Sequence, residues 1–115
     1  MNNARRKIIN RIADDLECIV DNYKEYENNQ MIENLDGIDK RIVDITSEEE
    51  EAFNNLPENL QDSDRGQVMQ DAIENLEEAS EDVCEASLIL SDDGDIEEAM
   101  DVAYGATISL REAAT

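Results

Sequence analysis

Carboxylate side chains are the groups in this sequence that could most readily do chemistry, because they number 31 against nine cations. At helical spacing, carboxylates can bind metal ions, act as paired acids and bases, or present negative charge to a basic partner. Between residues 42 and 110 there are 21 of them and one cation, Arg65. The first eleven residues have no acid and four cations, Arg5, Arg6, Lys7 and Arg11. We expect these cations to face an acidic helix of the same molecule or of a second subunit.

Catalysis and specific metal binding lack the residues that normally accompany paired carboxylates. The sequence has no histidine, so the Glu-x-x-His pairs of di-metal bundles are absent, as are a Gly-x-Ser-x-Gly motif and phosphate-binding glycine loops. If Gly94 is aligned with the glycine of an EF-hand loop, positions one and twelve become Ile89 and Met100. Both essential carboxylates are then missing. We therefore expect no enzymatic activity, no cofactor and no metal site.

The two cysteines and the hydropathy of the chain indicate in which cellular compartment the protein acts. Cys18 and Cys84 belong to no Cys-x-x-Cys or Cys/His cluster, which favours buried, reduced thiols over a disulfide or a reactive site. No apolar stretch approaches the roughly 20 residues needed to cross a bilayer, and MNNARRKIIN lacks a signal-peptide core. We expect a cytoplasmic protein.

Apolar residues at alternating steps of three and four predict the first helix, residues 3–29. Its seam is Ile9, Ile12, Leu16, Ile19, Tyr23 and Tyr26. The two tyrosines are predicted to pack against the core and not to stack on bases, since the acidic chain would repel DNA or RNA.

A second helix is predicted for residues 35–56, after a boundary within residues 27–37 that includes a turn at Asp36-Gly37. Its seam is Leu35, Ile38, Ile42, Ile45, Ala52 and Leu56, with Glu49 in an intermediate position. Two alternatives stay open: a restart at a Ser47–Glu50 capping box, or a short strand over residues 42–46. Pro57 and the polar residues after it predict a reversal.

The third and fourth helices are predicted for residues 64–91 and 95–113. The third has the seam Met69, Ile73, Leu76, Ser80, Val83, Ser87 and Leu90. Alanines at seven-residue intervals (72, 79 and 86, then 99, 106 and 113) predict that these two helices pack closely, and Gly105 is predicted to mark a close contact. Asp95 and Glu98 are placed as a capping box.

Together these elements predict an all-α fold: one domain, residues 1–115, forming a three- to four-helix bundle or helical hairpins with coiled-coil-like packing. Because small helical proteins often complete their cores by association, we also expect a homo-oligomer. The predicted self-association residues are Ile9, Ile12, Leu16, Ile19, Tyr23, Met69, Ile73, Leu76, Val83 and Leu90.

An acidic surface on the third and fourth helices is the predicted partner-binding site. Its residues are Asp71, Glu74, Glu78, Glu81, Asp82, Glu85, Glu97, Glu98 and Asp101. A net charge of −22 exceeds the magnitude of about 2–8 that usually keeps a small domain soluble. Carboxylates on rigid helices can imitate a nucleic-acid backbone and occupy a basic groove of a nucleic-acid-binding protein.

One stretch also resembles a group of known proteins. Residues 48–61, EEEEAFNNLPENLQ, followed by Ser63, Arg65-Gly66 and residues 72–79, AIENLEEA, are similar to small acidic helical proteins of bacterial phages and mobile elements. The resemblance covers about residues 47–90. It implies a phage-type origin but no function, because those proteins have no assigned activity. Small acidic phage proteins often resemble inhibitors of host restriction, CRISPR or other defence systems, so this origin, together with the negative charge, leads us to expect an inhibitor that acts in the host cytoplasm. The alternative is a self-assembling coiled-coil structural module without inhibitory activity.

Overall fold

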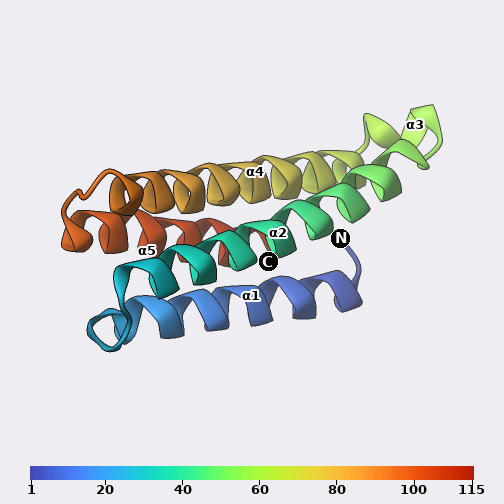
Figure 1. The fold of residues 1–115 in the computed structure, drawn as a ribbon. Coiled ribbons are helices and arrows are strands. Elements are labelled where there is room, and N and C mark those ends of the chain that lie inside the picture. Colours follow the sequence, from blue (N-terminus) through green and yellow to red (C-terminus); the bar gives the residue numbers. More distant parts are fainter.

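The computed structural model describes residues 1–115 and has no strand. Its elements are α1 (Asn3–Asp21), the 3-10 helix η1 (Tyr23–Glu25), α2 (Asn28–Asn54), α3 (Glu58–Gln61), α4 (Asp64–Ser91) and α5 (Ile96–Ala113). The four long helices run up and down in turn. Each packs on its sequence neighbour, and α5 also packs on α1 (Figure 1). The predicted all-α helical bundle is confirmed, with four long helices.

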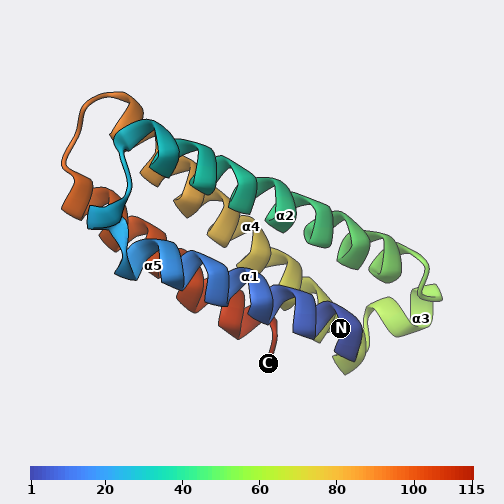
Figure 2. The same cartoon turned by 60° about the horizontal axis from the view of Figure 1, so that its bottom comes forward.

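The bundle is elongated because α2 and α4 are longer than α1 and α5. They contain 27 and 28 residues, against 19 and 18, and the molecule measures 49 × 23 × 18 Å. The α1–α2 and α4–α5 connections lie at one end, whereas α3 joins α2 to α4 at the other (Figure 2). No helix combines the length and apolar composition that crossing a membrane requires.

The core lies between the four long helices and contains most of the predicted seam. The fully or almost fully buried apolar side chains include Ile9, Ile12, Leu16, Leu35, Ile42, Ile45, Leu76, Val83, Leu90 and Leu110. Both alanine rows are buried too, which lets α4 and α5 pack against each other as predicted. At Gly105, however, an added Cβ would make only an ordinary 3.6 Å contact with the Asp82 carboxylate. The prediction that Gly105 marks a close helix contact is therefore wrong.

The first helix ends earlier than predicted. Asn22 caps it, since both its backbone N–H and its side-chain amide donate to the carbonyl of Cys18, at 3.1 and 2.8 Å. Tyr23 begins one 3-10 turn, and Tyr26 is extended. Both tyrosines still pack against the core, so the apolar spacing continued although the α-helix had stopped. The predicted end at residue 29 is wrong for this reason.

The second helix begins at Asn28, earlier than the predicted residue 35, and runs without interruption. The N–H of Glu27 donates to the Gln30 side chain at 3.0 Å at its start. Asp36-Gly37 therefore forms no turn. Neither the restart at Ser47 nor a strand over residues 42–46 occurs, because the buried isoleucines follow helical spacing and the Thr46 hydroxyl donates to the Ile42 carbonyl.

The last two helices match their predicted ranges within one residue. The Ser63 hydroxyl accepts from the N–H of Gly66 at the start of α4, and the Asp95 carboxylate accepts from the N–H of Glu97 at the start of α5.

Cys18 and Cys84 are free, but both are exposed. Their predicted burial is wrong because each lies outside the apolar seam of its helix.

Candidate functional site

A row of five carboxylates follows the outer side of α4, and we call it the α4 acidic stripe. It consists of Asp71, Glu74, Glu78, Glu81 and Glu85, all exposed. The steps of three and four residues place them on one side of the helix over about 21 Å. None of the five forms an ion pair, since all the ion pairs of the molecule involve other acids. The stripe therefore presents uncompensated negative charge.

Asp82 lies next to this stripe but faces α5. Its carboxylate is half-buried beside Gly105. Burial raises the pKa of Asp82 above its ordinary value, and the neighbouring charges of Glu78, Glu85 and Glu81 raise it further. Repulsion from the neighbouring acids of α4 thus acts in the same direction as burial, which is the larger cause.

The groove between α2 and α4 adds two carboxylates that were not among the predicted partner-binding residues, Glu50 and Glu77. A hollow of about 350 Å³ is lined by Glu50 of α2 and by Glu77 and Glu81 of α4, together with Val43, Thr46, Ser47 and Ser80. Glu50 was not predicted because its position opposite α4 depends on how two helices pack. The acidic surface therefore extends from α4 across to α2.

Farther along the same contact, polar side chains join α2 to α4. The Asp39 carboxylate accepts from the Ser80 hydroxyl and from the Cys84 thiol, and Asp36 accepts from the Ser87 hydroxyl at 3.1 Å. These contacts explain why serines occupy two seam positions of α4. Burial raises the pKa of the Cys84 thiol, as do its hydrogen bond to Asp39 and the Asp36 charge. Cys84 is therefore kept in its weakly nucleophilic thiol form.

The predicted acids on α5 lie apart from the stripe. Glu97, Glu98 and Asp101 are exposed, and the first two lie in the first turn, where carboxylates complement the helix dipole. Glu97 and Asp101 border a hollow that is also lined by Val20 of α1, Tyr23 of η1, and Met100 and Tyr104 of α5. Of the nine predicted residues, five thus form one row on α4, three form a separate group on α5, and Asp82 lies beside the row and faces α5.

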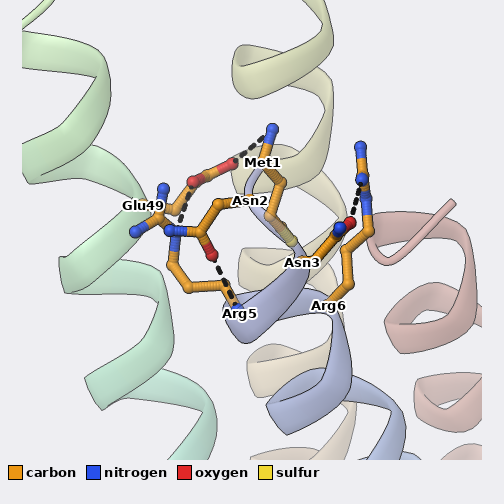
Figure 3. Close-up of polar contacts among 6 residues, drawn as sticks. All are labelled: Met1, Asn2, Asn3, Arg5, Arg6 and Glu49. Carbon is orange, nitrogen blue, oxygen red and sulfur yellow. Dashed lines mark hydrogen bonds and ion pairs between the residues drawn. The ribbon is translucent and has the colours of Figure 1, made fainter.

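Glu49 has a different environment from every other acid in the chain. Its carboxylate is fully buried, and Figure 3 shows Arg5 and Met1 pointing toward it from the start of α1. The Arg5 Nε donates to Glu49 Oε1 at 2.9 Å, and the Met1 ammonium lies 3.7 Å from Oε2. Arg5 satisfies the expectation that the basic start faces an acidic helix of the same molecule.

The other cations of the basic start have no carboxylate partner. The Arg6 guanidinium donates to the Asn3 side chain at 3.0 Å (Figure 3), and Lys7 and Arg11 are exposed without an ion pair. At the opposite end of the sequence, Arg111 of α5 donates to Asp14 and Glu17 of α1, each at 2.8 Å. These two acids raise the pKa of Arg111 and link α1 to α5.

Most of the predicted self-association residues lie within a single chain's core. Ile9, Ile12, Leu16, Met69, Leu76, Val83 and Leu90 are buried, and Ile19, Tyr23 and Ile73 are half-buried. A second subunit could reach the buried side chains only if the bundle opened. The exposed large apolar residues are others, among them Leu88, Tyr104 and Ile108.

No cluster of three or more potential metal ligands occurs in the structure. No protein-family model, curated protein or solved structure matches this chain.

Proposed function

We propose that this protein inhibits another protein by binding its basic, nucleic-acid-binding surface through the α4 acidic stripe. The observation that supports this proposal is the row of five exposed carboxylates without ion pairs on one rigid 28-residue helix. They recur about once per helical turn, a rise of about 5 Å, which is comparable with the phosphate spacing of about 3.4 Å along one DNA strand. Glu50 and Glu77 add charge beside this row.

The amount of charge favours this function over a purely solubilising role. A net charge of −22 lowers the stability of the compact state through self-repulsion, and solubility requires far less. A basic partner would relieve that repulsion by neutralising the surface. The likeness of residues 47–90 to phage proteins suggests the target class, a DNA- or RNA-handling protein of a host defence system.

The test compares two variants with the same change in charge. In the first, Glu74, Glu78, Glu81 and Glu85 of the stripe are all replaced by glutamine. In the second, four exposed glutamates away from the stripe, Glu25, Glu33, Glu48 and Glu51, are replaced likewise. Each tagged protein is incubated with nuclease-treated bacterial lysate, and the bound proteins are identified by mass spectrometry. We expect the wild type and the second variant to retain the same basic protein, and the first variant to lose it.

Two further observations make the test specific. Duplex DNA should release the captured protein, because both ligands would occupy one basic groove, and raising the salt concentration should also release it. Equal loss of capture by both variants would indicate non-specific attraction and contradict the proposal. Capture that survives in the stripe variant would exclude the stripe as the binding surface.

A further inference from the structure

The hollow between the end of α1 and the start of α5 differs from the other surface depressions in its lining. Its volume is about 360 Å³, and four of its six residues are apolar or aromatic: Val20, Tyr23, Met100 and Tyr104. The other two are the carboxylates Glu97 and Asp101, one helical turn apart on α5. No cation lines it. The hollow therefore combines an apolar wall, two aromatic rings and two negatively charged hydrogen-bond acceptors.

This combination suits the side chain of arginine. An arginine has an aliphatic stem that can lie on apolar walls and a planar guanidinium that stacks on aromatic rings. The guanidinium has five N–H donors, enough to bind two carboxylates together. A lysine would offer a point charge without the planar stacking surface. A neutral polar side chain would leave both carboxylates without a charged partner.

The structure contains one cation near these aromatic residues. The Lys24 Nζ lies 5.9 Å from the centre of the Tyr23 ring, within the range of a cation–π contact. Lys24 is not among the residues that line the hollow, so the hollow itself remains open to a ligand. Nearby, Tyr104 is 48% exposed, a large fraction for an aromatic residue on a bundle this small.

We propose that this hollow binds one arginine side chain of the basic partner and thereby orients that partner on the acidic surface. The inference rests on the proposed function and names the chemistry of one contact. The stripe supplies long-range attraction that many basic proteins would satisfy. The hollow supplies a site of defined shape, which requires an arginine at one place on the partner.

The test uses a blocked glycine pentapeptide with a single central arginine, titrated into the isotope-labelled protein at physiological salt and followed by NMR. We expect saturable shifts of the backbone amides of Tyr23, Asp101 and Tyr104. The same peptide with citrulline, which is similar in shape but uncharged, should bind about tenfold more weakly. Equal binding of citrulline, or shifts spread over all acidic helices without saturation, would overturn the proposal.

Two matched double variants test the location. Replacing Glu97 by glutamine and Asp101 by asparagine should weaken arginine-peptide binding about tenfold. Replacing Glu98 and Glu112, which lie outside the hollow on the same helix, by glutamine removes the same charge and should change it less than about twofold. An equal effect of both pairs would contradict the inference. Lys24→Gln should tighten binding, since it removes a competing cation near the Tyr23 ring.

The stripe variant separates this inference from the proposed function. With four stripe glutamates replaced by glutamine, the hollow is intact, so the arginine peptide should bind as it does to the wild type. If the peptide fails to bind while lysate capture still depends on the stripe, the hollow inference is wrong and the proposed function stands. If the peptide binds but capture does not depend on the stripe, the proposed function is wrong.

Discussion

Glu49 and Glu50 are adjacent glutamates with opposite environments. Glu50 is exposed in the groove between α2 and α4, whereas Glu49 is fully buried and held by Arg5. A charge removed from water needs a partner with good geometry, and the Arg5 Nε supplies it at 2.9 Å. This contact joins the start of α1 to the last third of α2. Glu49 is the one fully buried acid of the chain and thus acts as a structural residue.

Replacing Glu49 by glutamine should lower the free energy of unfolding by about 2–4 kcal/mol, because Arg5 would lose its charged partner in a part-buried site. Urea denaturation followed by circular dichroism measures the change. The adjacent exposed residue gives the control, since Glu48→Gln should change stability by less than about 0.5 kcal/mol. In a double-mutant cycle, Arg5→Leu should cost much less in the Glu49→Gln background than alone. Additive losses would show that the two residues are not coupled.

At the scale of the secondary-structure elements, the junction of α3 and α4 depends on a glycine. Gly66 lies in the first turn of α4, where a Cβ would come within 2.0 Å of the Gln61 carbonyl oxygen and 2.7 Å of the Leu60 oxygen. Both are backbone atoms, so no side-chain movement could relieve the clash. The short helix α3 can pack against α4 in this way only because residue 66 lacks a side chain.

Gly66→Ala should therefore destabilise the protein by about 1–3 kcal/mol, in the range of an overpacked site. Gly37→Ala is the matched control, because Gly37 lies in the exposed middle of α2 with no atom within 4 Å of the added methyl group. It should stabilise the protein by about 0.5–1 kcal/mol through better helix propensity. Thermal unfolding of the two variants measures whether the stability of each falls or rises. A neutral Gly66→Ala substitution would show that the α3–α4 junction adjusts freely.

At the scale of the whole molecule, charge repulsion opposes the packing of the bundle. The chain carries a net charge of −22, and its carboxylates have few ion-pair partners: besides Glu49, only Asp14, Asp15 and Glu17 are paired. Such exposed pairs contribute little to stability. Added salt should therefore weaken the repulsion between carboxylates more than it weakens the attraction within the few ion pairs.

Raising sodium chloride from 20 to 150 mM should increase the melting temperature by about 5 °C, since added ions shorten the distance over which carboxylates repel each other. Differential scanning calorimetry measures the shift, and sucrose at equal osmolality controls for effects of solute alone. The stripe variant should respond less, because four of the repelling charges are gone. A flat or falling melting temperature in the wild type would contradict this account of the charge.

The sequence by itself determined the features that depend on neighbours within a few residues. Most seam residues of the long helices and both alanine rows follow from local helical spacing and are buried as predicted, and five of the six acids predicted on α4 form the α4 acidic stripe. The same helical spacing failed to predict the end of α1, because Tyr23 and Tyr26 continue the apolar spacing after the α-helix has ended.

Only the tertiary structure decided the features that depend on distant contacts. Arg5 and Glu49 are 44 positions apart, and Ser80 and Asp39 are 41 apart, so no local pattern pairs them. The hollow likewise requires the end of α1 to lie beside the start of α5. The predicted seams could have packed within one chain or between several chains. The antiparallel order of the four helices buries most of their side chains within one chain, because each helix finds its apolar partners there.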